Sequence, residues 1–194
     1  MTTAIEYISC ADTAKLVRRE LKTRWPGVKF SVRSKIYSMG ASIDVSWTDG
    51  PREPEVTPTA KRFEGADFDG SIDLKTNKSH WMAPDGTVTL AHAEGTESSR
   101  GTLPQIDHDS PQPGARRVEF MADYVFCTRH ISNMEEQATI CRQYIREHCQ
   151  TEGSGSGERC GADYVDMLAY RMAYDRAEGE DWAAPFRRVV LRES

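Results

Sequence analysis

One set of residues in this sequence has the types that a zinc site requires. Cys127 and His130 are three positions apart, and Cys141, His148 and Cys149 follow. Structural zinc is held tetrahedrally by four thiolate or imidazole ligands, usually supplied by two tight pairs. Only the first pair is tight here, because Cys141 fits the apolar stripe of a helix and adjacent helical positions such as 148 and 149 diverge by about 100°. We therefore expect neither a metal site nor another cofactor.

A second pattern has the form of part of a calcium loop. Asp67, Asp69 and Asp73 surround Gly70, and alternating carboxylates can converge on a cation. A complete EF-hand loop also has a further acidic pair and a glutamate at its twelfth position, which are missing here. Turn formation by Asp69-Gly70 is the simpler interpretation.

Catalytic patterns are the third kind of chemistry to consider. Nucleophilic catalysis requires a cysteine or serine next to a histidine and an orienting acid. The chain has five histidines, but it has no nucleophile elbow, no phosphate-binding glycine loop and no His-Glu-x-x-His motif. The sequence thus indicates no catalytic residue and favours a binding protein over an enzyme.

A basic segment is the best candidate for a binding surface. Between Thr13 and Ile36, eight lysines and arginines accompany one acid, which leaves a charge of +7 there and −12 elsewhere, for a total of −5. A surface of two signs can steer an anionic partner to one face, although a helix and a strand also place basic side chains on their solvated sides. Tyr37 adds an aromatic ring that can stack on a base. The predicted binding residues are Arg18, Lys22, Lys29, Arg33, Lys35 and Tyr37.

The elements that position these residues follow from hydrophobic periodicity. Ser9 and Asp12 form a capping pattern, and an apolar stripe follows at helical spacing, so we expect a helix over about 11–24 that Pro26-Gly27 ends. Two alternating runs and a short connector at 37–40 then predict an antiparallel hairpin. Its inward residues would be Phe30, Val32, Ile36, Ile43, Val45 and Trp47, and its outward residues would include Lys29, Arg33, Lys35 and Asp44.

The remainder of the chain gives weaker patterns. Composition rich in Gly, Ser, Pro, Asp and Gln predicts a long loop or local disorder over 91–116, and the glycines and serines of 153–157 predict a flexible linker or a tight surface loop. The other expected elements are a helix within 55–63 with Pro58 in its first turn, a turn at Asp69-Gly70 and a short strand, a hairpin over 81–90, a strand over 118–126, a helix over 133–148, a helix from Asp163 to 176 and a strand over 186–191.

Together these elements predict an α+β fold, in which an N-terminal helix packs on an antiparallel β-sheet and two further helices follow. We expect an α+β domain over 1–150, with the flexible loop at 91–116, and a helical extension over 151–194 that packs on it. No apolar run approaches the roughly 20 residues that span a bilayer, and the start of the chain lacks a secretory pattern. Five cysteines at scattered spacings favour reduced thiols, so we expect a cytoplasmic protein with no membrane partner.

Several of these segments also resemble a known family. Residues 14–18, 26–34, 45–51 and 68–70, together with 122–132, are similar to the large polyvalent protein-associated domain 29 family. The resemblance implies a protein of phages or conjugative elements, and it supplies no catalytic residues. Residues 78–116 and the tail after 149 fall outside it.

The resemblance and the residues together give two functional hypotheses. The leading one is a non-enzymatic accessory protein that binds and inhibits a host defence protein or ribonucleoprotein complex, of the anti-restriction or anti-CRISPR type. The alternative is a nucleic-acid-binding module that uses the basic helix and hairpin, although the pI near 5.6 is low for that class.

Overall fold

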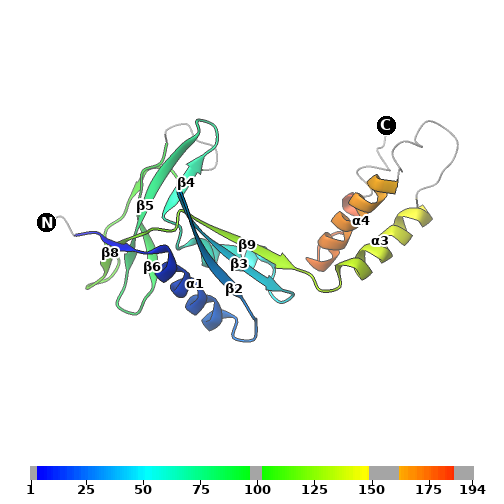
Figure 1. Cartoon of the computed structure of the whole chain (residues 1–194), viewed down its shortest axis with the longest axis horizontal. Coiled ribbons are helices and arrows are strands. Elements are labelled where there is room, and N and C mark those ends of the chain that lie inside the picture. Colours follow the sequence, from blue (N-terminus) through cyan, green and yellow to red (C-terminus); the bar gives the residue numbers. More distant parts are fainter. Residues whose placement is uncertain (1–3, 97–101, 149–161, 186–194) are drawn as a thin grey trace. The chain divides into compact units, whose positions relative to one another are not determined.

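The computed structural model describes residues 4–96, 102–148 and 162–185, and it confirms the α+β class (Figure 1). The chain forms two compact units, Met1–His130 and Ile131–Ser194. We predicted that residues 1–150 form one domain and that residues 151–194 pack on it, and this stays a prediction. In the described part of the chain, no helix is long and apolar enough to cross a membrane.

The first unit contains two β-sheets and two helices. One sheet has the order β1-β8-β5-β6-β7, with β4 paired to β5, and the other has the order β2-β3-β9. Two pairings are parallel, β1 with β8 and β3 with β9, and both join segments far apart in the sequence. The elements are β1 (Glu6–Ile8), α1 (Cys10–Arg24), β2 (Ser31–Tyr37), β3 (Gly40–Thr48), α2 (Glu53–Lys61), β4 (Ala66–Asp69), β5 (Leu74–Met82), β6 (Val88–Ala93), β7 (Ile106–Asp107), β8 (Arg116–Phe120) and β9 (Tyr124–His130).

Helix α1 forms where its cap and apolar stripe predict it. The Ser9 hydroxyl oxygen accepts the Asp12 amide at 3.1 Å, which satisfies one of the free N–H groups of the first turn. Val17 and Leu21 are completely buried, and they share one hydrophobic core with both sheets. The helix ends at Arg24, before Pro26-Gly27.

The predicted hairpin is β2 and β3, with Val32 opposite Val45 and Tyr37 opposite Gly40. Alternation places Val32 and Val45 against α1, as expected. Ile36 is a correction, because it shares the inward face yet is 81% exposed. Helix α1 begins at Cys10, whose Sγ lies 3.9 Å from the Lys35 carbonyl oxygen, so the strand residues after Lys35 extend past the start of the helix that covers the others.

Helix α2 begins earlier than the sequence pattern suggested, and Pro58 lies inside it rather than in its first turn. Pro54 occupies an early position, where no amide partner is required. Pro58 has no backbone N–H group, so it removes one helical hydrogen bond from this short helix.

The expected strand over 118–126 is wrong as a single element, because the chain divides it between β8 and β9 of different sheets. The expected loop over 91–116 is also wrong in part: β6 continues to Ala93, β7 adds two residues that pair with it, and β8 begins at Arg116. The partners of β8 and β9 are distant in the sequence, which local composition does not reveal.

Residues Glu64–Ala66 join the two sheets at the break between β8 and β9. The Gly65 amide donates to the Ala122 carbonyl at 2.8 Å, and the Ala66 amide donates to the Asp123 carbonyl at 3.2 Å. A Cβ atom on Gly65 would lie 1.8 Å from the Phe120 carbonyl oxygen. Only glycine lets the two backbones approach this closely.

The second unit is a pair of helices, α3 (Met134–His148) and α4 (Ala162–Ala177). The expected stripe of α3, Ala138, Cys141 and Ile145, is buried in one cluster with Met172 and neighbouring residues of α4. The Arg142 guanidinium joins the helices through an ion pair with Asp166 at 2.7 Å. Helix α4 begins one residue before Asp163, the expected cap, and the expected linker at 153–157 and strand at 186–191 lie outside the described residues.

We predict that Gly65→Ala lowers the free energy of unfolding of the first unit by about 3 kcal/mol or more, because an overpacked site surrounded by backbone cannot relax. Chemical denaturation followed by circular dichroism measures the change. Gly27→Ala is the matched control, since nothing lies within 4 Å of its added Cβ, and it should change stability by less than about 1 kcal/mol. Equal stability of the two variants would contradict the packing argument.

Candidate functional site

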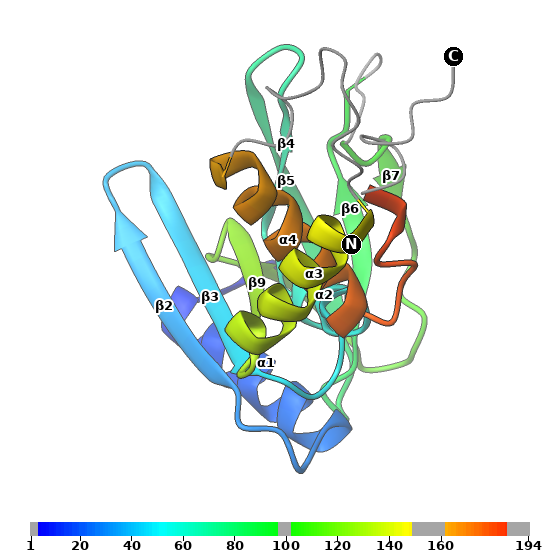
Figure 2. The ribbon, with the colours of Figure 1, turned by 90° about the vertical axis from the view of Figure 1, so that its right-hand side faces the viewer.

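The β2-β3-β9 sheet has one covered face and one open face. Helix α1 lies behind this sheet in Figure 2 and packs on the face that carries Val32, Ile43 and Val45. Side chains at alternate positions point the other way, and we call this side the outer face. The outer face includes Arg33, Lys35, Tyr37, Ser42, Asp44, Ser46, Thr48, Tyr124, Phe126, Thr128 and His130, several of which are exposed, whereas Ser42 is buried.

Aromatic and basic side chains lie in neighbouring rows on the outer face. Strand register aligns Arg33, Asp44 and Phe126 in one row. The next row contains Lys35 on β2 and Tyr124 on β9. Phe126 is 53% exposed although it is a large apolar side chain, and its ring centroid lies 6.2 Å from that of Tyr124. This ring pair is available for contact with a flat ligand.

The charge of the outer face is modest and positive. Lys35 pairs with Asp44 at 2.8 Å, while the Arg33 side chain makes no hydrogen bond or ion pair with any described residue. Burial raises the pKa of Tyr124, and the nearby Asp123 carboxylate raises it further, so its phenol stays neutral at physiological pH. The face thus presents one unmatched guanidinium beside neutral rings.

The structure divides the six predicted binding residues between two places. Arg33, Lys35 and Tyr37 share the outer face, whereas Arg18 and Lys22 belong to α1 behind the sheet. The Arg18 guanidinium donates to the Val32 carbonyl at 2.6 Å along the free edge of β2. Lys29 precedes β2 and is exposed.

Tyr124 and Phe126 are the outer-face residues that the sequence did not single out. Their spacing, with Val125 between them, is the usual alternation of a half-buried strand. The alternation does not reveal the outer face, because the run that begins at Val118 predicts a single strand. A single strand over 118–126 gives no reason to place Tyr124 and Phe126 beside β3.

The two candidate metal patterns have other roles in the structure. Cys127 points inward beneath α2, where burial raises the pKa of its thiol to about 11, and His130 lies on the outer face of the same strand. The Asp69 carboxylate accepts the amide and hydroxyl of Ser71, as in a turn. Among the described residues, no group of three or more His, Cys, Asp or Glu side chains converges as metal ligands, and Cys149 lies outside them.

A buried polar cluster, formed by Glu64, Lys78 and His80, is a feature for which sequence reasoning proposed no role. The Glu64 carboxylate accepts the Val125 amide at 2.9 Å and lies 3.5 Å from the Lys78 ammonium. His80 is only 4% exposed, and its Nδ1 atom has no hydrogen-bond partner. Burial, with a smaller contribution from the Lys78 charge, lowers the pKa of His80 to about 3. The available signal was alternation along β5, which puts Lys78, His80 and Met82 on its buried face.

Comparison with known proteins places the first unit in a family. The profile of the large polyvalent protein associated domain 29 family matches residues 8–132. The chain belongs to this family. The match confirms the resemblance expected from the sequence and associates the chain with phages and mobile genetic elements. It also corrects the extent of that resemblance, because residues 78–116, which were expected to fall outside it, lie within the match. Searches of curated proteins and of solved structures returned no match.

We predict that His80 makes the fold sensitive to acid. The ring is neutral when folded but takes up a proton when unfolded below about pH 6.5, so the unfolded state binds more protons and stability falls as the pH drops toward about 3. Between about pH 7 and pH 4.5 this contribution amounts to about 2 to 3 kcal/mol. Urea unfolding at both pH values measures it.

The comparison requires a variant without the titrating ring. Between about pH 7 and pH 4.5, the His80→Leu variant should lose less stability than the wild type, and the difference should be about 2 to 3 kcal/mol. His108→Gln, at an exposed position of the same unit, should keep the wild-type pH dependence. Identical acid sensitivity of His80→Leu and the wild type would show that His80 does not titrate in this way.

Proposed function

We propose that the first unit binds single-stranded nucleic acid on the outer face of the β2-β3-β9 sheet. The observation that carries this proposal is a pair of rings, the exposed Phe126 and the half-buried Tyr124, in the two rows that also contain Arg33 and Lys35 of β2. Of the two hypotheses from the sequence, the geometry favours this one.

Stacking supplies most of the binding energy in this proposal. A base stacked on an aromatic side chain contributes about 1–3 kcal/mol whatever its identity, because every base has a π face. Tyr37, which is exposed, is a third ring on the same face, at the end of β2.

Electrostatics plays a smaller part and selects the strand over the duplex. Arg33 can neutralise one phosphate, and Lys35 can do so if it leaves Asp44. Duplex DNA hides its base faces and offers mainly phosphates, which a protein with a net charge of −5 repels on the whole. We therefore expect a preference for single strands and a low dependence on sequence.

Substitution of the rings tests the stacking contribution. We predict that Phe126→Ala and Tyr124→Ala each weaken binding of a labelled oligothymidylate of about 12 nucleotides by fivefold or more. Fluorescence polarisation at low salt measures the affinity. Tyr7→Ala removes an exposed ring of β1 outside the outer face and should bind as the wild type does. Undetectable binding of the wild type to DNA and RNA would refute the proposal.

Salt dependence tests the charge contribution. A plot of the logarithm of the association constant against the logarithm of the salt concentration has a negative slope. We predict that Arg33→Gln makes this slope less steep by about 0.7, the value for one phosphate contact with a single strand. Arg33→Glu combined with Lys35→Glu should weaken binding more than Arg33→Gln does, with the fold intact. Lys15→Gln, an exposed position on α1, is the charge-matched control and should leave the slope unchanged.

A second function, counter-defence, is favoured by the family match. We propose that the protein acts without catalysis in the bacterial host cytoplasm and inhibits a defence protein or ribonucleoprotein complex, in the manner of anti-restriction or anti-CRISPR proteins. A ribonucleoprotein offers an exposed RNA strand to the outer face, which would connect the two functions. Association of the family with phages and mobile elements supports this proposal.

Plating efficiency tests the second function. Expression of the chain should raise phage plating or conjugation in cells that carry the targeted defence system, and leave cells without that system unaffected. Arg33→Glu with Lys35→Glu should remove the effect if the outer face makes the contact. No difference across a broad panel of defence systems would count against counter-defence.

A further inference from the structure

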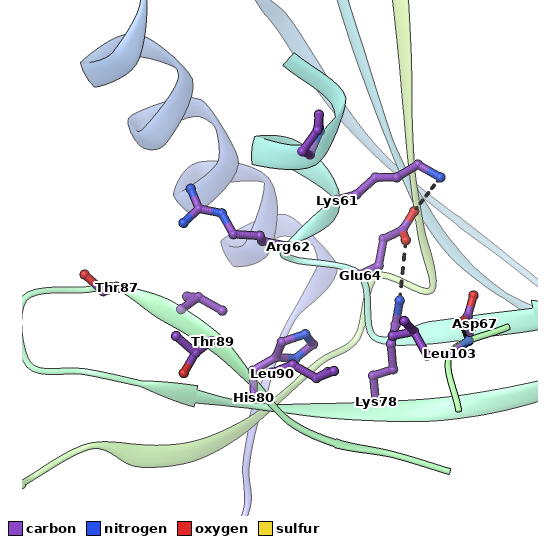
Figure 3. Close-up of a pocket in the computed structure, with 12 residues that line it drawn as sticks. Lys61, Arg62, Glu64, Asp67, Lys78, His80, Thr87, Thr89, Leu90 and Leu103 are labelled. Atoms are coloured by element: carbon purple, nitrogen blue, oxygen red, sulfur yellow. Dashed lines mark hydrogen bonds and ion pairs between the residues drawn. The ribbon is translucent and has the colours of Figure 1, made fainter. Parts of the chain in front are cut away.

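The basic side chains of the first unit differ in how far acidic groups balance them. A cavity of about 680 Å³ lies between the end of α2 and the β5-β6 part of the larger sheet (Figure 3). There the Glu64 carboxylate lies between the ammonium groups of Lys61 and Lys78, at 3.6 Å and 3.5 Å. Asp67 adds a second carboxylate to the lining. These opposite charges balance, in contrast to those along β2.

Positive charge along β2 exceeds the negative charge beside it. Arg33 is exposed and makes no hydrogen bond or ion pair with any described residue. The Arg18 guanidinium lies at the open side of the strand, where it donates to the Val32 carbonyl at 2.6 Å. Lys35 has an acidic partner, Asp44, at 2.8 Å. Three basic side chains thus accompany one carboxylate along this strand, which leaves a positive edge.

The same edge has open backbone groups. Strand β2 is the end strand of its sheet, and Arg18 reaches the Val32 carbonyl from the open side. Across from Ile36, the Ala41 amide donates at 3.1 Å to a carboxylate on the other side of β3. Because backbone groups of an antiparallel strand alternate in direction, the N–H and C=O groups of Ser34 and Ile36 point to the open edge. No described residue pairs with these groups.

The side chain of Ile36 indicates what would lie next to this edge. It is 81% exposed on the inner face, whereas Ala41 across from it is 6% exposed. A further strand beside β2 would place every second side chain on this face, where an apolar one would cover Ile36. The intervening side chains would lie on the outer face next to Arg33 and Lys35. Acidic side chains fit there.

A second copy of the chain does not fit this edge. Pairing of two β2 strands, parallel or antiparallel, would bring the basic side chains of both copies together on the outer face. Like charges on adjacent strands destabilise the pair, and charged edge strands prevent association with identical strands in this way. The same charges favour a strand of opposite sign.

We propose that β2 receives an extended acidic segment of a partner protein as a fourth strand of its sheet. The backbone groups of Ser34 and Ile36 hydrogen-bond to the segment. Its carboxylates lie beside Arg33 and Lys35, and its apolar side chains cover Ile36. This interaction does not rest on the proposed binding of nucleic acid, which the rings of β9 would carry.

Titration of the full chain, labelled with ¹⁵N, tests the proposal by NMR. The probe is the peptide Thr-Val-Glu-Val-Glu-Val-Thr with blocked ends, and the control peptide has lysine in place of glutamate. At low millimolar concentration, the acidic peptide should shift the backbone amide resonances of Ser34 and Ile36 and bind at least tenfold more tightly than the control. The proposal is overturned if these two amides do not shift or if both peptides bind equally.

Substitutions at the edge test the backbone pairing. Ser34→Pro removes the N–H group at the edge, which proline tolerates on an edge strand, and should weaken binding of the acidic peptide about tenfold. Ser34→Ala keeps this N–H group and is the matched control, which should bind as the wild type does. Ile36→Thr, at an exposed position where the fold should persist, should weaken binding about threefold. Wild-type affinity in Ile36→Thr or in folded Ser34→Pro would overturn the proposed geometry.

Analytical ultracentrifugation without peptide tests the other occupant of the edge. The wild type and Ser34→Pro should sediment alike, because the proposal gives β2 no role in self-association. A wild-type dimer that Ser34→Pro dissociates would show that the edge binds a second copy of the chain, and would overturn the proposal.

Discussion

The first unit depends most on the contacts of one group, the Glu64 carboxylate. It accepts an amide of β9 and lies beside the ammonium groups of Lys61, at the end of α2, and Lys78, on β5. A buried carboxylate is tolerated only where hydrogen bonds and opposite charges replace its hydration. Here those partners come from a helix and from both sheets, so one side chain holds three elements in fixed relation.

The same junction determines what the outer face presents. Amides of Gly65 and Ala66 bind the carbonyls that precede β9, and the Asp123 side chain accepts the Ala41 amide at 3.1 Å. These bonds start β9 in register beside β3. Register in turn decides which side chains face outward, since a shift by one residue would bury Tyr124 and Phe126 and expose Val125. The candidate nucleic-acid surface therefore depends on the buried cluster behind it.

Sequence periodicity predicted the local part of this architecture. Helix α1, the β2-β3 hairpin and the apolar stripe of α3 each follow from a pattern of residues near in the chain, and all are present. Parallel pairing of β3 with β9 leaves no such local trace, so the break after Phe120 and the ring pair of Tyr124 and Phe126 were not anticipated. Lys78 and His80 were missed because charged and titratable residues are seldom buried without a partner that only the fold reveals.

The two parallel pairings have a consequence for how the chain emerges from the ribosome. Glu6 pairs with Val118, and Ile43 pairs with Val125, so neither β1 nor β3 gains its last neighbour until the segment near 120 has been synthesised. Helix α1 and the hairpin can assemble earlier, but one side of β3 then remains open to other strands. Such distant pairing slows folding, because closing a long loop costs entropy before any contact is made. The nascent protein therefore passes through a stage at which an unprotected strand can join the wrong neighbour.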